Sequence, residues 1–252
     1  MRRILTALAL IPIVVYVVMW ANYWVFLGVV ALSACLCYRE YNDIAAACGF
    51  GAPGPLGYAA GLVLLVWPGW QVLVAAALVA FLLSMRMDDL SKALPHSALL
   101  VTGLVYAFGC WIPAGLLRAA SPHWLMFALI LNWVGDTGAY VVGRKFGKHK
   151  LAPRVSPKKS WEGAAASVVT AVLFAGSYLA WFVRVPVLHA VLLTSAANIA
   201  GQLGDLAESA IKRGAGVKDS SSILPGHGGF LDRVDSTLFA LPVVYAYVRW
   251  TL

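Results

Sequence analysis

Apolar stretches follow one another along nearly the whole chain, and they limit what it can fold into more than any other feature. A window of about 19 residues finds nine of them, at 4–20, 23–38, 56–67, 70–84, 97–117, 124–143, 163–182, 187–206 and 230–250. Such stretches predict membrane-spanning helices, so we expect an all-α, polytopic helical bundle. The composition agrees, because 61% hydrophobic and 12% charged residues lie outside the range of soluble domains. The third and fourth stretches are short, and Pro68-Gly69 between them is either a tight hairpin or a re-entrant turn.

The basic residues indicate how this bundle is oriented. Threading nine spans from a cytoplasmic N-terminus leaves only Arg118, Arg184 and Arg249 of the 19 Lys and Arg outside, with Arg233 within a span. This is the positive-inside pattern. The first apolar run shows no small-residue cleavage site and no transit peptide precedes it, so we interpret it as a retained span. We expect a multi-pass protein of a bacterial inner membrane.

The two halves of the chain differ in their polar content. Residues 1–122 are nearly featureless apolar spans, which could form a dimer interface. Residues 123–252 carry acids within spans and two basic loops, 144–162 and 212–229, and we expect the chemistry there. The four cysteines form no C-x-x-C pair, which argues against a thiolate zinc site or a disulfide scaffold.

Acidic residues inside spans are the strongest functional signal. They are Asp136, Asp205, Glu208, Asp232 and Asp235. A carboxylate at mid-bilayer costs about 2.5 to 3.5 kcal/mol, so each needs a partner. Counted along ideal helices, Asp136, Asp205 and Asp232 lie within about 12 Å of the predicted cytoplasmic loops.

Helical spacing predicts where these acids point. Three polar faces arise: Asn132, Asp136 and Tyr140 in the sixth span; Asn198, Gln202, Asp205 and Ser209 in the eighth; and Asp232, Asp235 and Ser236 in the ninth. Facing one another, they would form an aqueous pocket open to the cytoplasm. Oxygen ligands without Cys or clustered His favour Mg²⁺. The alternative is structural, with Asp paired to Arg233 or Lys212 across helices.

Both basic loops have residues suited to phosphate. The first contains S-P-K-K-S-W-E-G from Ser156, in which Ser160 is expected to cap a helix and the lysines supply positive charge. It could equally be a basic loop on anionic lipid headgroups, the role we expect for Arg144, Lys145, Lys148 and Lys150. The second loop contains G-H-G-G around His227, whose glycines allow close backbone approach to a ligand. His227 could donate to phosphate, transfer a proton or cap the turn.

A dozen positions in the second half form a recognisable pattern. They are Ser209, Lys212, Arg213, Lys218, Asp219, Pro225, His227, Gly228, Gly229, Asp232, Arg233 and Asp235, preceded by D-T-G-A-Y from Asp136 and by the S-P-K-K-S-W-E-G loop. At these spacings, over about residues 132 to 240, the chain resembles the phosphatidate cytidylyltransferase (CDP-diacylglycerol synthase) family. The resemblance implies transfer of CMP from CTP to phosphatidic acid, with release of pyrophosphate, by a polytopic, dimeric enzyme of phospholipid biosynthesis. It also implies metal binding by Asp205 and Asp232, and a potassium ion beside the Mg²⁺.

These inferences assign roles to individual residues. Asp205 and Asp232 would hold Mg²⁺, with Asp235 and Asp136 as further ligands; Lys159 and His227 complete the expected catalytic set with the first two. The expected substrate-binding residues are Ser156, Lys158, Lys159, Lys212, Arg213, Lys218, Asp219, Gly228, Gly229 and Arg233.

Other functions use similar features. A CTP-dependent polyprenol or lipid kinase would transfer the terminal phosphoryl group instead, and a CDP-alcohol phosphotransferase would carry a D-G-x-x-A-R pattern that this chain lacks. An organophosphate transporter would need polar groups through the outer half of its spans as well. Nucleic acid is not an expected partner, because the basic residues line a membrane face.

Overall fold

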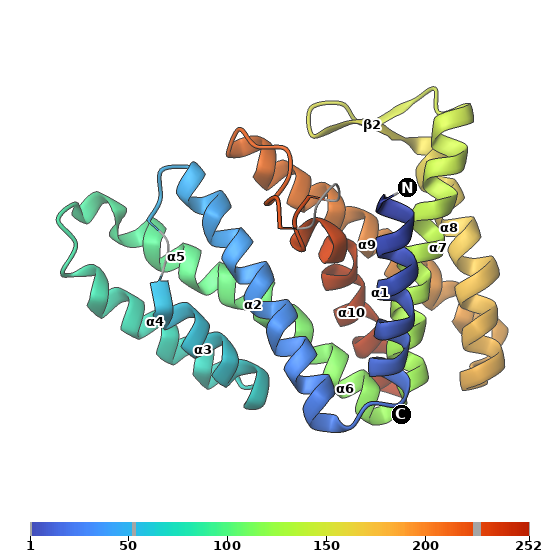
Figure 1. Cartoon of the computed structure of the whole chain (residues 1–252), viewed down its shortest axis with the longest axis horizontal. Coiled ribbons are helices and arrows are strands. Elements are labelled where there is room, and N and C mark those ends of the chain that lie inside the picture. Colours follow the sequence, from blue (N-terminus) through green and yellow to red (C-terminus); the bar gives the residue numbers. More distant parts are fainter. Residues whose placement is uncertain (1, 52–53, 224–227, 252) are drawn as a thin grey trace.

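The computed structural model describes residues 2–51, 54–223 and 228–251, and it is a bundle of helices (Figure 1). Each predicted apolar stretch coincides with a helical rod, which confirms an all-α, polytopic membrane architecture. Two of the rods are assembled from consecutive segments, one of α-, 3₁₀- and π-helix and the other of α- and π-helix. The elements are α1 (Arg2–Met19), α2 (Tyr23–Ala47), α3 (Gly54–Val66), α4 (Trp70–Ser84), η1 (Leu90–Lys92), α5 (Ala93–Gly103), η2 (Leu104–Phe108), η3 (Gly109–Trp111), α6 (Ile112–Ala120), α7 (Pro122–Phe146), β1 (Lys150–Ala152), β2 (Ser156–Ser160), α8 (Trp161–Ala171), η4 (Val172–Gly176), η5 (Leu179–Val183), α9 (Val187–Gly214) and α10 (Leu231–Thr251).

Within the part of the chain that the structure describes, five rods are long and apolar enough to cross a bilayer: Tyr23–Ala47, Leu90–Ala120, Pro122–Phe146, Trp161–Val183 and Val187–Gly214. Helices α3 and α4 have 13 and 15 residues, or about 20 and 22 Å at 1.5 Å per residue. The hydrocarbon core is about 30 Å thick, so the full count of nine crossings stays a prediction. Between α3 and α4, which contact each other, the chain turns within residues 67–69, which fits both a tight hairpin and a re-entrant turn.

The polar connections gather at one end of the bundle. Figure 1 shows the start of α1, the β1–β2 hairpin and the segment after α9 at the same end, with the C-terminus at the opposite end. We call the end of the bundle that holds the β1–β2 hairpin the hairpin end. Expected loop 144–162 is more ordered than its sequence suggested, because β1 and β2 pair antiparallel within it, with Lys150 opposite Ser160. The expected cap is confirmed: the Gly163 N–H donates to Ser160 Oγ at 3.2 Å.

Glycines set how closely the helices of the second half approach. A Cβ added to Gly204 of α9 would lie 2.7 Å from the backbone oxygen of Asp235 in α10. One added to Gly201 would lie 2.8 Å from Asn132 Oδ1. Such distances leave no room for a side chain on α9, so α9 and α10 meet almost backbone to backbone, with the Asn132 side chain of α7 packed against Gly201. This contact brings the acids of three helices to one place.

The first half is packed differently, around aromatic rings. The Tyr38 ring contacts the rings of Tyr58 and Phe108, with centroids 5.0 and 5.4 Å apart. A Cβ on Gly57 or Gly61 would overlap the Tyr38 or Phe108 ring. These contacts bind α2, α3 and the Leu90–Ala120 rod into an apolar unit beside the polar one.

Candidate active site

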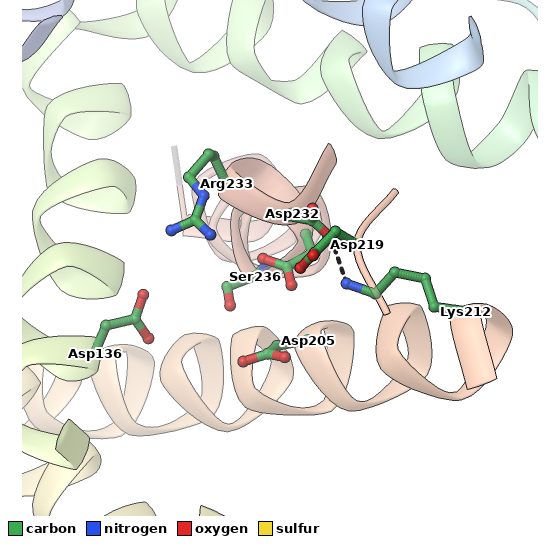
Figure 2. Close-up of a pocket in the computed structure, with 8 residues that line it drawn as sticks. Asp136, Asp205, Lys212, Asp219, Asp232, Arg233 and Ser236 are labelled. Atoms are coloured by element: carbon green, nitrogen blue, oxygen red, sulfur yellow. Dashed lines mark hydrogen bonds and ion pairs between the residues drawn. The ribbon is translucent and has the colours of Figure 1, made fainter. Parts of the chain in front are cut away.

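A cavity of about 280 Å³ lies where α7, α9 and α10 meet at the hairpin end, with the segment after α9 along one side. All its lining residues are polar or charged: Asp136, Asp205, Lys212, Asp219, Asp232, Arg233, Asp235 and Ser236. Figure 2 shows Asp136 entering from α7 on one side and Lys212 from the far end of α9 on the other. The four acids predicted to bind metal therefore share one cavity, although they lie up to 99 positions apart in the sequence.

Asp232 is the most firmly held of these acids. It lies in the first turn of α10, where backbone N–H groups are unpaired and a negative charge is favoured. Its Oδ2 accepts from the N–H groups of Gly229 at 2.7 Å and Ser220 at 3.1 Å, and its Oδ1 forms an ion pair with Lys212. These contacts fix the carboxylate at the cavity wall.

Lys212 links two acids at one side of the cavity. Its Nζ forms ion pairs with Glu208, one turn earlier on α9, and with Asp232 on α10. Lys212 is 8% and Glu208 1% exposed, and a charge so deeply buried requires such partners. The interhelical pairing considered from sequence therefore exists here. If Lys212 binds substrate as expected, it must do so while paired with Glu208 and Asp232.

The β1–β2 hairpin supplies a second cation to the site. Lys159 Nζ lies 2.6 Å from Asp205 Oδ2. Successive strand residues point to opposite sides, and accordingly Lys158 is exposed while Lys159 is half-buried. The sequence motif contains both lysines. Of these two, Lys159 alone forms an ion pair with a cavity residue within the described chain.

The remaining lining groups differ in exposure. Asp235 is buried, and its Oδ1 accepts from the Ser236 N–H at 2.7 Å. Asp136 and Arg233 are exposed, and Figure 2 places the Arg233 guanidinium on the side of the cavity away from Asp205. Arg233 is therefore accessible to an incoming anion, whereas Asp235 is buried.

Some predicted substrate residues lie outside the cavity lining. Lys218 is exposed, and Arg213 donates to the backbone oxygens of Val155 and Val217, at 3.4 and 3.2 Å, which ties the hairpin to the turn after α9. Ser156 begins β2. Gly228 has a φ of +82°, and a Cβ there would lie 2.6 Å from Asp232 Oδ2, so glycine is required. His227, predicted to be catalytic, lies outside the described residues.

The predicted polar faces are only partly directed at the cavity. Asn132 donates to Thr237 Oγ1 at 3.2 Å, Asn198 to Ser167 Oγ at 3.1 Å, and Gln202 to the Ala164 oxygen at 3.2 Å. These amides join helices instead of lining the pocket. The expectation that whole stripes face water was wrong for them, because an amide inside a bundle is stabilised by a partner on the next helix.

The donor set suits a hard divalent cation. Five carboxylates and two cationic groups line the cavity, a formal excess of three negative charges. Over residues 2–51, 54–223 and 228–251, no three Asp, Glu, His or Cys side chains converge closely enough to hold a metal by themselves. Mg²⁺ is commonly bound through one or two carboxylates, with waters and substrate phosphates completing the shell. The residues present therefore fit Mg²⁺ bound together with a phosphate ligand.

Sequence reasoning missed Glu40. The second apolar stretch was expected to end at residue 38, but α2 continues to Ala47 and places Glu40 inside the bundle, where it is 0% exposed. Its carboxylate accepts hydrogen bonds from Ser220 and Ser221 within loop 212–229 and from the two residues directly after that loop, Phe230 and Leu231. The available signal was an acid less than one turn after an apolar run.

Comparison with known proteins gives a consistent result. A family model described as "Cytidylyltransferase family" matches residues 1–251. A phosphatidate cytidylyltransferase of Haemophilus influenzae is 44% identical over 156 residues, 55% of this chain and 54% of that protein. Proteins of the same name from Bacillus subtilis and Staphylococcus haemolyticus are 46% and 45% identical over 123 and 129 residues, covering 46% and 49% of their lengths. The chain thus spans about half the length of the curated relatives that it matches.

Proposed function

The chain belongs to the cytidylyltransferase family, and from that premise we propose that it is a phosphatidate cytidylyltransferase. It would transfer CMP from CTP to phosphatidic acid, giving CDP-diacylglycerol and pyrophosphate. The observation that carries the proposal is an acid-rich cavity, flanked by Lys159, at one end of a bundle of apolar helices. Such a site gives a water-soluble nucleotide access to a lipid phosphate that stays at the membrane surface.

The chemistry requires charge neutralisation and alignment more than a strong base. The phosphate of phosphatidic acid is already a nucleophile at neutral pH. One of its oxygens forms a bond to the α-phosphorus of CTP while the bond from that phosphorus to the bridging oxygen of pyrophosphate breaks. Both substrates are polyanions, so the site must hold them in line against their mutual repulsion. No covalent enzyme intermediate is needed.

The cationic side chains would hold the phosphates. Lys159 comes from the hairpin and contacts Asp205, and Arg233 comes from α10 and lines the cavity. Lys159 would release Asp205 and bind a CTP phosphate, while Arg233 would bind the second anion. Ser156, Lys158, Arg213 and Lys218, nearer the outside, would add longer-range attraction to the nucleotide.

Asp205 and Asp232 would hold Mg²⁺, with Asp235 and Asp136 as further ligands. When bound, Mg²⁺ neutralises phosphate charge and polarises the phosphoryl oxygens. Without a counter-cation, five carboxylates would repel CTP. We further propose that K⁺ is a second ion, that the enzyme is a homodimer of a bacterial inner membrane, and that the cavity opens to the cytoplasm.

One assay tests the proposal against its alternatives. Purified protein in mixed micelles would be incubated with α-labelled CTP and phosphatidic acid, with Mg²⁺ or with excess EDTA, in K⁺ or Na⁺. We expect labelled CDP-diacylglycerol and equimolar pyrophosphate, only with Mg²⁺. Labelled CDP would instead indicate a lipid kinase, and uptake of CTP into proteoliposomes without a lipid product would indicate a transporter.

A further inference from the structure

Glu40 in α2 closes the base of the loop that leads into α10. Its Oε1 accepts from Ser221 Oγ at 2.6 Å and from the Phe230 N–H at 2.8 Å. Its Oε2 accepts from Ser220 Oγ and from the Leu231 N–H, both at 2.7 Å. Each oxygen thus takes one hydroxyl from the start of the loop and one backbone N–H from its end.

These contacts explain how a carboxylate tolerates full burial. Four donors at 2.6 to 2.8 Å replace its hydration. Two of the donors belong to the start of α10, where backbone N–H groups have no partner within the helix. Glu40 therefore acts as an N-terminal cap supplied by a different helix, 190 and 191 residues away in the sequence.

The same loop residues also hold Asp232. Ser220 donates its hydroxyl to Glu40 and its backbone N–H to Asp232 at 3.1 Å, so it connects the two carboxylates directly. Gly229 donates its N–H to Asp232 at 2.7 Å. A Cβ on Gly229 would overlap Ser220 Oγ and lie 2.5 Å from Glu40 Oε2. The base of the loop is therefore packed with no spare room between Glu40 and Asp232.

From this arrangement we propose that Glu40 is a positioning residue, which fixes residues 220–221 and 229–231 so that the Asp232 carboxylate faces the cavity. This inference rests on the proposed function for its consequence in catalysis. It also assigns a role at the site to the apolar half of the chain. Glu40 does not line the cavity, so it acts through Ser220 and the start of α10.

The decisive variant is Glu40→Gln. The amide group would replace one oxygen, and a serine hydroxyl can turn round to become an acceptor for it. A backbone N–H cannot turn, so one of Phe230 and Leu231 loses its partner. The matched control is Asp43→Asn, which removes a negative charge from an exposed site on the same helix.

Hydrogen exchange would report the position of the loop without any assay of activity. In Glu40→Gln we expect faster exchange in peptides covering residues 218–223 and 228–233, and unchanged exchange there in Asp43→Asn. The Ser220→Ala/Ser221→Ala double variant, which removes the two hydroxyl donors and keeps the acid, should change in the same direction. This double variant replaces Glu40→Gln as the test if Glu40→Gln cannot be purified. Wild-type exchange in the variants would overturn the proposal.

Kinetics would then test the catalytic consequence. Misplacement of a catalytic group by about 1 Å can lower the rate by about a hundredfold, so we expect kcat to fall by about ten- to a hundredfold in Glu40→Gln. The KM for CTP should change by less than about threefold, because the cationic groups are untouched. An unchanged kcat would show that Glu40 is structural only. If the wild type makes no CDP-lipid, the proposed function fails, while the exchange experiment still decides whether Glu40 holds the loop.

Discussion

The two halves of the molecule are built from the same element, a membrane helix, but one half uses it for apolar packing and the other to form a polar site. In the first half, α2, α3 and the Leu90–Ala120 rod pack through aromatic rings such as those of Tyr38 and Phe108. In the second half, α7, α9 and α10 meet at glycines and place charged groups between them. The difference teaches that helices which meet at glycines can bring polar groups of several helices together at one cavity. Where helices meet through large rings, the rings fill the space between them. Glu40 is an exception in the first half, because its buried carboxylate binds the loop that leads into α10.

The largest effect is expected where the polar half would hold its metal. Asp232→Asn keeps the volume and one acceptor oxygen but removes the charge that would bind Mg²⁺ and that pairs with Lys212. We expect turnover to fall by at least about a hundredfold, the scale of losing one electrostatic contact to the reacting group. Formation of CDP-diacylglycerol from labelled CTP measures it. Asp89→Asn, at an exposed helix cap in the other half, is the control, and near-normal activity of Asp232→Asn would end the metal assignment.

A smaller effect is expected at the hairpin. Lys159→Ala removes the ammonium group that lies 2.6 Å from Asp205, and we expect the apparent KM for CTP to rise about tenfold, the cost of one charge-assisted hydrogen bond. Initial rates over a range of CTP concentrations give this value. Lys158→Ala should have a weaker effect because Lys158 is exposed, and Lys145→Ala should have none. Equal effects of Lys158→Ala and Lys159→Ala would contradict the alternation of the strand.

Paired glycine variants compare the two kinds of packing directly. Gly204→Ala would force α9 and α10 apart, and Gly57→Ala would push on the Tyr38 ring. Each should destabilise the fold by about 1 to 3 kcal/mol, the usual cost of overpacking. Only Gly204→Ala should also lower kcat, because it moves Asp205 relative to Asp235. Thermal unfolding in detergent and the CTP assay separate these results, with Gly28→Ala, whose added Cβ meets nothing within 4 Å, as the control.

The smallest effect concerns hydroxyls inside the aromatic half. Tyr41 Oη donates to the Leu99 oxygen at 3.2 Å, so Tyr41→Phe should cost about 1 kcal/mol. Tyr38 Oη is buried without a hydrogen-bond partner among the described residues, so Tyr38→Phe should change stability by less than about 0.5 kcal/mol or increase it. Thermal unfolding of the two variants gives the comparison. A larger loss in Tyr38→Phe would mean that its hydroxyl contributes a contact that these residues do not supply.

The sequence by itself determined the architecture and the identity of the acids. Apolar runs of helical length predict helices wherever they occur, and acids inside such runs are too costly to be incidental; Asp136, Asp205, Asp232 and Asp235 were found in this way. Tertiary structure decided what each polar group contacts. Helical spacing places Asn198 and Asp205 on the same face of α9 and predicts the same role for both. In the structure Asn198 joins α9 to α8, whereas Asp205 lines the cavity. Nor could Glu40 be connected with Ser220, because a contact across 180 residues depends on how helices pack, which local periodicity does not encode.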